Sequence, residues 1–206
     1  MARRSQSSIR LFENDFLESL THVHPITPLV MWSPVALYLF WQAFTVKQIS
    51  IADFGVWFLI GMLVWTFTEY TVHRFLFHYP AKSEVGKKLI FLFHGIHHDD
   101  PDDATRLVMP PVPGVILMVL LYSLFSLVIP GKFMEVFMAW FIIGYLCYDY
   151  IHYATHHFPM TSKVGKYLRK FHLRHHHAKE ESKYGVSNPL WDYVFRTVTG
   201  PKKDRK

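Results

Sequence analysis

Histidines are the residues of this chain best suited to chemistry, and ten of its 14 fall into four short groups. The groups are His73 and His78, then His94, His97 and His98, then His152 and His156, and lastly His172, His175 and His176. Imidazole is the commonest side-chain ligand for zinc, iron and copper at neutral pH, and it binds a metal in its neutral form. We therefore predict a centre that holds two metal ions.

The spacing within the groups indicates how the ligands divide between the ions. Residues four apart on a helix lie on the same face, so His94 and His98 can bind one ion, and the last two groups contain matching pairs. The intervening histidines, His97 and His175, point aside toward the neighbouring ion. We predict that the first ion is bound by His73, His78, His94, His98 and His175. We predict that the second is bound by His97, His152, His156, His172 and His176.

Two features of the surrounding sequence bear on this centre. His73 and His78 are five residues apart, a spacing that a regular helix would turn away from one face, so we expect the helix to end or bulge there, shortly before Pro80. Glu69 and Asp149 lie within apolar helices close to the ligands. Metal-binding histidines usually donate their second ring N–H to a carboxylate or a carbonyl. Both acids are candidates for that role, and the alternative is a polar contact between helices.

Isolated histidines and tyrosines are usually ordinary surface or core residues. We apply that interpretation to the four remaining histidines, which are His22, His24, His157 and His177. Tyrosines at helix ends of membrane proteins usually lie at the membrane interface, which is the expectation for Tyr148, Tyr150 and Tyr153.

Four long apolar stretches must position these ligands. They run from about Ile26 to Val46, Ile49 to Val72, Val108 to Ile129 and Phe133 to His156. Each approaches or exceeds the roughly 20 helical residues that span a bilayer. The helices of a soluble bundle would show polar faces with a period of 3.6 residues, and these stretches mostly do not. We predict a single all-α domain over residues 1–206 with four transmembrane helices.

The connections and charges predict the topology. Short turns around Lys47 and Lys132 join the stretches into two hairpins, with both turns on one side of the membrane. The other side receives the N-terminus, residues 73–107 and residues 157–206, which would form a helical cap around the metals. That side carries 20 of the 22 Lys and Arg residues, so the positive-inside tendency places it in the cytoplasm.

Composition excludes several classes of protein. Half of the residues are hydrophobic, and the net charge of +6 comes from residues that flank apolar runs, which favours an anionic membrane surface over a nucleic acid. Cys147 is the single cysteine and lies in an apolar run, which excludes intrachain disulfides and cysteine-based metal sites. The N-terminus has no apolar core or small-residue cleavage site, so we expect it to be retained.

The histidine groups have the pattern HxxxxH, HxxHH, HxxxH and HxxHH, which resembles the integral-membrane fatty acid hydroxylase and sterol desaturase superfamily. The sequence segments around these groups are most similar to those of fatty acid 2-hydroxylases. The similar segments, in order, are FTEYTVHRFLFH, HGIHHDDPDDATRLVMPP, GYLCYDYIHYATHH and YGVSNPLWDYVF. The resemblance runs from about residue 60 to the C-terminus. It implies a dimetal site in a four-helix membrane stem with a cytosolic helical cap.

The resemblance also implies a reaction, which is hydroxylation of the carbon next to the carbonyl of a fatty acyl chain, free or in a ceramide or other sphingolipid. It would use two iron ions and dioxygen, and zinc could occupy the site in a purified sample. Many eukaryotic relatives carry an N-terminal haem domain, which the residues before the first stretch do not supply. Electrons are therefore expected from a separate b-type cytochrome, or from a ferredoxin with its reductase. The membrane would be the endoplasmic reticulum in a eukaryote and the inner membrane in a bacterium.

The chain departs from the family at one position, and three other functions would each leave a different pattern in the sequence. Relatives often carry glycine where this chain has Arg196, which lies outside the metal ligands. A hydroxylase or desaturase acting on a sterol or carotenoid would share the ligands, but the segment HHDDPDDATRLVMPP favours an acyl substrate. A membrane metal transporter would place ligands at the middle of the bilayer, whereas these lie at one edge. A soluble DNA-binding protein would have no place for the apolar stretches.

Overall fold

The structure is a computed structural model that describes residues 8–178 and 182–199, and the elements in these ranges are all helices. The α-helices are α1 (Asp15–Ser19), α2 (Thr27–Thr45), α3 (Ile51–Val72), α4 (Glu84–Ile90), α5 (Ile96–Asp99), α6 (Pro111–Phe125), α7 (Met134–His157), α8 (Lys163–His177) and α9 (Leu190–Val194). Two π-helical segments, His73–Phe77 and Phe91–Gly95, continue α3 and α4. The expectation of an all-helical chain is confirmed.

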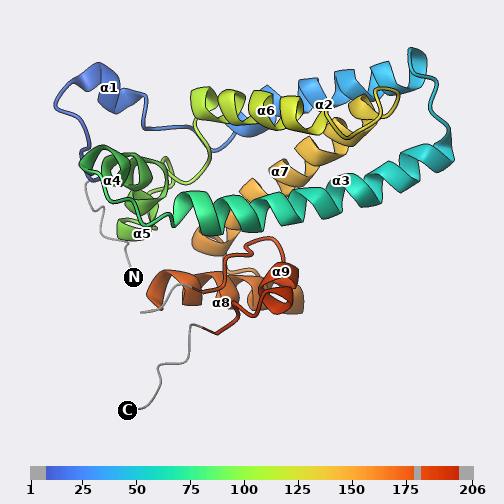
Figure 1. The fold of residues 1–206 in the computed structure, drawn as a ribbon. Coiled ribbons are helices and arrows are strands. Elements are labelled where there is room, and N and C mark those ends of the chain that lie inside the picture. The colour runs from blue at the N-terminus through green and yellow to red at the C-terminus, as the bar shows by residue number, and fades with distance from the viewer. Residues whose placement is uncertain (1–7, 179–181, 200–206) are drawn as a thin grey trace.

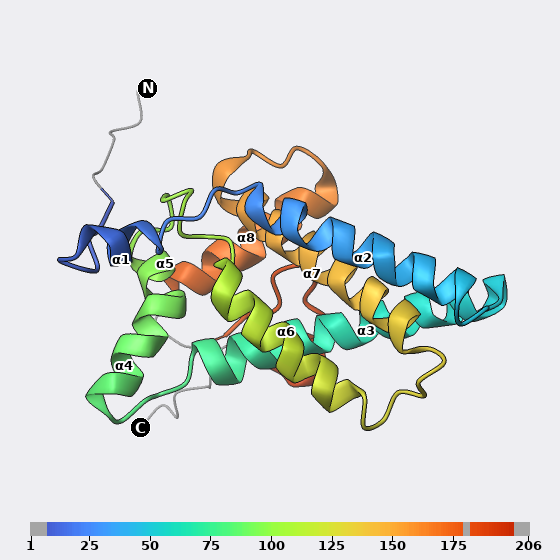
Figure 2. The same cartoon turned by 90° about the horizontal axis from the view of Figure 1, so that it is seen from above.

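Four long helices form a stem with α7 at its centre. Helix α7 passes between α2 and α3, and α6 lies across the same bundle (Figures 1 and 2). Large side chains of α7, such as Phe137 and Phe141, are fully buried. They pack with Trp65 of α3 and Trp32 of α2. Many side chains that face away from α7 are apolar and exposed, such as Leu37 and Leu59. An apolar outer surface around an apolar core is what a bilayer stabilises.

The helices α3 and α7 approach each other closely at two glycines. A Cβ atom added at Gly144 of α7 would lie 2.6–2.9 Å from atoms of Trp65, and one added at Gly61 of α3 would lie 2.7 Å from the Cβ atom of Trp140. Small residues let the backbones of membrane helices come together, and van der Waals packing then holds them. The absence of a side chain at these two positions therefore fixes how α3 and α7 cross.

We expect Gly144→Ala to destabilise the stem, because the new methyl group would overlap the Trp65 side chain. Overpacking of this kind costs about 1–3 kcal/mol. Thermal unfolding of the purified protein in detergent measures the effect. Gly55→Ala in α3 is the matched control, since nothing lies within 4 Å of the added Cβ. Equal unfolding midpoints for the two variants would contradict the close approach.

Two of the four expected spans meet the length and composition of a membrane-crossing helix. They are Ile51–Phe77, with a mean hydropathy of 1.6, and Met134–His157, with 1.3. Helix α6 is apolar but only 15 residues long, which gives about 22 Å at 1.5 Å per residue. It begins later than expected because Pro110, Pro111 and Pro113 fit only before a helix or in its first turn.

The turn that joins α2 to α3 and the turn that joins α6 to α7 meet at one end of the bundle (Figure 1). Ser50 begins α3 with a capping box in which its hydroxyl and the Asp53 carboxylate satisfy each other's backbone N–H groups. The Nζ atom of Lys47, between α2 and α3, lies 3.2 Å from Glu135 at the start of α7. Both turns therefore lie together, and α4, α5 and α8 gather at the opposite end.

The expected distortion at His73 is present as a π-helical segment. The N–H of His78 donates to the carbonyl oxygen of His73 at 3.2 Å, which is the five-residue step of a π-helix. This step places residues five apart on one face, so the π-helix reconciles the spacing of His73 and His78 with a common target. The second π-helical segment, which contains His94, was not anticipated.

Candidate metal centre

Five segments bring ten imidazoles together at the end of the stem opposite the turns. The first π-helical segment supplies His73 and, at the residue that follows it, His78, and the second supplies His94. Helix α5 supplies two rings, α7 supplies two, and α8 supplies three. Seven of the ten side chains are buried and three are half-buried, the latter being His78, His98 and His176. Histidines are seldom this buried without hydrogen bonds or a metal.

The first group consists of His73, His78, His94, His98 and His175. One ring nitrogen from each lies within 4.8 Å of the other four. The Nε2 atom of His94 lies 3.0 Å from that of His73 and 2.9 Å from that of His98. His78 and His175 face each other with their Nε2 atoms 3.1 Å apart.

The second group consists of His97, His152, His156, His172 and His176. The Nε2 atom of His172 lies 2.8 Å from that of His156 and 3.0 Å from that of His176. His152 and His97 make the remaining close pair, at 3.0 Å. The structure thus brings together the same two sets that the spacing predicted.

The two groups are adjacent, and each contains one histidine from a segment whose other histidines belong to the other group. The rings of His98 and His176, one from each group, stack with centroids 4.2 Å apart. His97 lies between two first-group histidines in the sequence but belongs to the second group. His175 lies between two second-group histidines but belongs to the first group. Each HxxHH segment therefore contributes to both groups.

Burial keeps the imidazoles neutral. The pKa values of His94, His97 and His172 lie well below the usual range, chiefly because burial disfavours the charged ring and then because neighbouring imidazoles would repel it. Burial, followed by the charge of His78, lowers the pKa of His98 to about 4. Neutral rings retain the nitrogen lone pair that a metal requires.

The geometry of both groups fits a metal ion. Two nitrogen ligands at about 2.1 Å from one ion, at right angles to each other, lie about 3.0 Å apart, and ligands on opposite sides lie about 4.2 Å apart. The close Nε2 pairs, at 2.8–3.1 Å, match the first value. Neutral imidazoles whose lone pairs converge repel one another unless a proton or a cation lies between them. Each group therefore offers five ring nitrogens at distances that suit a cation.

Backbone carbonyls fix two rings of the first group. The Nδ1 atom of His73 donates to the carbonyl oxygen of Tyr184 at 2.5 Å, and that of His175 donates to the carbonyl oxygen of Ser182 at 2.7 Å. With the proton on Nδ1, Nε2 carries the lone pair and faces the other ligands. The carbonyls therefore select the tautomer that binds metal.

Two buried carboxylates hold the loop that carries these carbonyls. Asp192 of α9 accepts the backbone N–H groups of Tyr184 and Gly185 at 2.9 and 2.7 Å. Glu69 of α3 accepts the backbone N–H groups of Val186 and Ser187 at 2.6 and 2.8 Å. Each carboxylate thus positions a ligand indirectly, through the backbone.

Glu69 and Asp149 are the two candidates for accepting a ring N–H, and the structure shows hydrogen bonds of both to other groups. The hydrogen bonds of Glu69 among the described residues go to the loop, and Asp149 accepts the Tyr145 hydroxyl at 3.1 Å. The ring N–H acceptors that the structure shows are carbonyls. Asp192 was missed, because its link to the ligands spans the fold; its position in the segment YGVSNPLWDYVF was the available signal.

We expect Asp192→Ala to destabilise the loop and reduce the metal content. The change leaves two buried N–H groups without their acceptor, and each such loss costs about 1–3 kcal/mol. Unfolding midpoint and bound metal per chain, measured on the same sample, test this result. Asp15→Ala, at an exposed carboxylate of α1, is the control. A full metal complement in Asp192→Ala would contradict a positioning role.

A mostly apolar cavity of about 360 Å³ opens onto the histidines. His94 of the first group and His97 and His152 of the second line it, so it reaches both groups. Its other walls come from α1 and its flanks, α5, the start of α6 and the segment before it, and α7. Leu17, Leu20, Ile96, Val108, Ile116 and Tyr148 are among the lining residues. The volume suits a small ligand or part of a chain.

The remaining histidines belong to neither group. His22 contacts Thr105 and Arg106, and His24 accepts the N–H of Ile26. Tyr148 departs from the interface position expected for it: it lines the cavity, and its ring lies 5.8 Å from that of His152. An α-helix with two buried faces cannot be assigned a single inward face from sequence, which explains this difference.

Comparison with known proteins adds to this geometry. A family model described as fatty acid hydroxylase matches residues 58–197. The dihydroceramide fatty acyl 2-hydroxylase FAH2 of Arabidopsis thaliana is 37% identical over 197 residues, covering 96% of this chain and 83% of the relative. The fatty acid 2-hydroxylase of Rattus norvegicus is 35% identical, and the match covers 96% of this chain and 59% of that protein.

A solved structure shares the fold. It is described as full-length scs7p with only the hydroxylase domain visible. The TM-score is 0.85 at 37% sequence identity, and the match covers 94% of this chain and 73% of that one. The ceramide very long chain fatty acid hydroxylase scs7 of Schizosaccharomyces pombe is 38% identical, with 94% of this chain and 56% of the relative covered.

Proposed function

This chain belongs to the fatty acid hydroxylase family, and from that membership we propose that it hydroxylates carbon 2 of the fatty acyl chain of a ceramide-type lipid. It is an oxidoreductase of lipid metabolism, as its 2-hydroxylase relatives are. The observation that carries the proposal is the position of two five-imidazole groups at one end of an apolar cavity.

The proposal assigns one iron ion to each group of five histidines. Iron with dioxygen and external electrons supplies the oxidising power to break an unactivated C–H bond, which acid–base side chains lack. Zinc would fit the same nitrogen ligands but has no redox chemistry. The protein contributes binding and orientation, since an error near 1 Å in placing a reacting carbon costs about a hundredfold in rate.

The cavity determines which carbon is presented. Apolar side chains such as Ile96, Val108 and Ile116 would surround the acyl chain and exclude water. Asp149 and Tyr148 line the same cavity near the histidines and supply polar atoms for the carbonyl end. An acyl chain with its carbonyl held there has carbon 2 as its first C–H position, which supports hydroxylation at that carbon.

Mass spectrometry of lipids from cells that express the chain, grown under heavy-isotope dioxygen, tests this function. The expected product is a ceramide whose acyl chain carries one labelled hydroxyl at carbon 2. Cells without the chain should lack it. A labelled hydroxyl on a sterol or a carotenoid ring, with unmodified acyl chains, would refute the proposal in favour of the related ring hydroxylases.

We also propose that α2 and α6 cross the bilayer with α3 and α7, giving four spans in one domain. Residues 73–107 and 157–206 would form a cytosolic cap, with both termini on that side. Support comes from the shared end of both turns and from the Lys and Arg residues at the other end. The membrane would be the endoplasmic reticulum in a eukaryotic host and the inner membrane in a bacterial one.

Single cysteines introduced into a Cys147→Ser background are expected to report this topology. Lys47→Cys and Lys132→Cys should react with a membrane-impermeant thiol reagent from one side, and Lys166→Cys from the other. Sealed vesicles of known orientation give the readout. Labelling of all three positions from the same side would contradict the two-hairpin arrangement.

Electrons are proposed to come from a separate protein, either a b-type cytochrome or a ferredoxin with its reductase. The cap would present the metal centre to such a donor on the cytosolic side. Turnover of the purified chain with each donor in turn distinguishes the two. Turnover with dioxygen and substrate alone would remove the need for a donor protein.

A further inference from the structure

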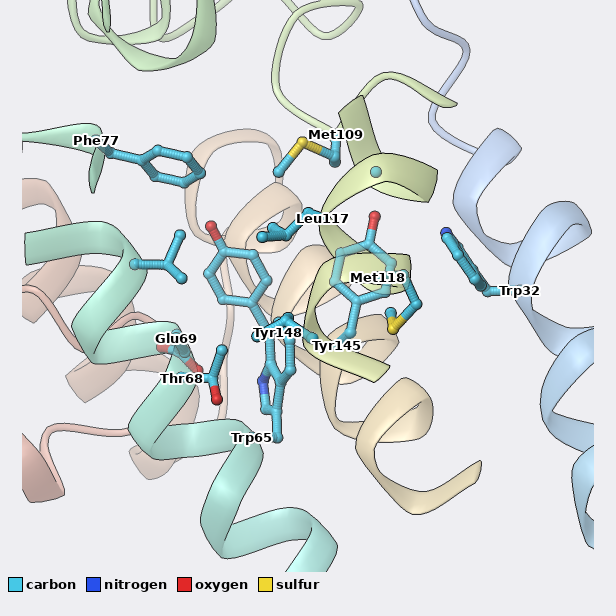
Figure 3. Close-up of a pocket in the computed structure, with 13 residues that line it drawn as sticks. Trp32, Trp65, Thr68, Glu69, Phe77, Met109, Leu117, Met118, Tyr145 and Tyr148 are labelled. Carbon is cyan, nitrogen blue, oxygen red and sulfur yellow. The ribbon is translucent and has the colours of Figure 1, made fainter. Parts of the chain in front are cut away.

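The apolar cavity beside the histidines continues deeper into the stem. A second, narrow cavity of about 50 Å³ lies between α3, α6 and α7, and it shares three lining residues with the first: Phe77, Met109 and Tyr148. Figure 3 shows this second cavity, with Phe77 and Met109 at one side. The two cavities are therefore adjacent, and none of the ten grouped histidines lines the second.

The second cavity ends at Trp32 of α2 and Met118 of α6. In Figure 3, Trp32 lies at the side opposite Phe77, and Met118 lies beside Tyr145 between them. The same two residues line a groove of about 350 Å³ between α2, α6 and α7. The groove is apolar and opens to the outside, where its residues Val119 and Tyr122 are exposed.

Met118 and Trp32 form the wall between the second cavity and the groove. Met118 is an unbranched thioether with three rotatable bonds, a residue that adapts to irregular space. The Trp32 ring packs edge-on against Tyr145 with centroids 6.4 Å apart, and its Nε1 atom is buried without a hydrogen-bond partner among the described residues. Turning either side chain breaks no hydrogen bond.

We propose that Trp32 and Met118 form a gate through which the methyl end of a long acyl chain passes into this groove. The proposal rests on the acyl hydroxylation proposed above and adds the selection of chain length. Short chains end within the two cavities, whereas longer chains need the groove. The gate residues touch the far end of the substrate and not the reacting carbon, so they determine specificity.

The groove's lining argues for an acyl chain as its occupant. None of the groove residues is charged, and those around the gate are aliphatic or thioether side chains, including Val35, Leu39, Val115 and Met138. The groove also borders the second cavity, and that cavity borders the one beside the histidines, in each case through shared lining residues. A continuous hydrocarbon chain can fill all three, because each buried methylene stabilises binding by the same apolar contact.

Gate variants test the proposal by the chain length of the product. We expect Met118→Ala and Trp32→Leu to raise the ratio of the longest to the shortest 2-hydroxylated acyl chains from a mixed ceramide pool, by about fourfold for each methylene newly accommodated. Trp41→Leu is the control for Trp32→Leu, because Trp41 also lies on α2, is 55% exposed and lines neither the two cavities nor the groove. A ratio equal to that of the control would overturn the gate.

Filling the groove should have the opposite effect. Val35→Phe is expected to lower the same ratio, and combined with Met118→Ala it should cancel the gain. If Val35→Phe leaves the ratio unchanged, the groove does not hold the chain. If the gate variants alter turnover of all chain lengths equally, the path serves as an entrance and does not select length.

A second readout separates this inference from the hydroxylation itself. The lipids that co-purify with each variant are identified by mass spectrometry, which requires no turnover. We expect Met118→Ala to retain longer acyl chains than the unaltered protein. If the unaltered protein is inactive and Met118→Ala still retains longer chains, hydroxylation is refuted and the gate stands. If the unaltered protein is active and Met118→Ala retains the same chains as it does, the gate alone is refuted.

Discussion

Replacing His97 and His175 together by alanine should abolish 2-hydroxylation, with a loss of more than about a hundredfold. The expectation follows because each change removes one imidazole from a different group of five. Loss of residues that only orient ligands already costs about 10–100-fold in metal affinity or activity. Lipid mass spectrometry of cells expressing the variant beside the unaltered protein gives the measurement.

The single variants make the prediction sharper. His97→Ala should empty the site that includes His152 and His156, although His97 is flanked in sequence by ligands of the other group. His175→Ala should empty the site that includes His73. Each single variant should therefore retain about one metal per chain when its metal content is measured, and the double variant less.

Variants at two histidines outside the groups provide the control. His24→Ala with His177→Ala removes the same number of imidazoles from exposed positions, so activity and metal content should stay near those of the unaltered chain. Equal amounts of 2-hydroxy product from the control and from His97→Ala with His175→Ala would refute the proposed centre.

Removing the metals should lower the thermal stability of the purified protein substantially. A ligand present at 1,000 times its dissociation constant stabilises a fold by about 4.1 kcal/mol. For a chain of this size, each kcal/mol corresponds to about 2–4 °C in the unfolding midpoint, so we expect a drop of about 8–16 °C for each ion removed. The physical reason is that converging nitrogen lone pairs repel each other once the cation is gone.

Unfolding with and without a strong chelator measures this effect, and adding iron back should restore the midpoint. The His97→Ala, His175→Ala variant is the matched control, because it has lost a ligand from each group and should respond little to the chelator. A chelator effect of the same size in both proteins would show that the stabilising metal binds elsewhere.

The parts of the site that sequence could predict are those set by local geometry. The pairing of His94 with His98 follows from the helical repeat, and the irregularity at His73 follows from a spacing that an α-helix cannot satisfy. Each involves residues within about one helical turn. Local spacing therefore predicted the pairs within each segment, and the structure groups the ten rings in the two sets that we assigned.

The parts that sequence missed depend on contacts between distant segments. Asp192 reaches the ligands through the backbone of Tyr184, and Glu69 contacts Ser187, which lies 118 residues away in the chain. The periodicity of the sequence does not reveal contacts of this kind.

Arg196, where relatives often have glycine, adopts a φ of 59°, a left-handed conformation that glycine adopts more easily. The sequence showed the departure from glycine, but not that the backbone at this position is left-handed.

The contribution of α8 to both groups has a consequence for how the protein is made. His175 completes one group, and His172 and His176 complete the other. Neither group is therefore complete until α8, a late segment of the nascent chain, has been synthesised. The apolar stem precedes that segment in synthesis. A message truncated after α7 would therefore yield the apolar stem with four of the five histidines of the first group and three of the five of the second, so that neither group would be complete.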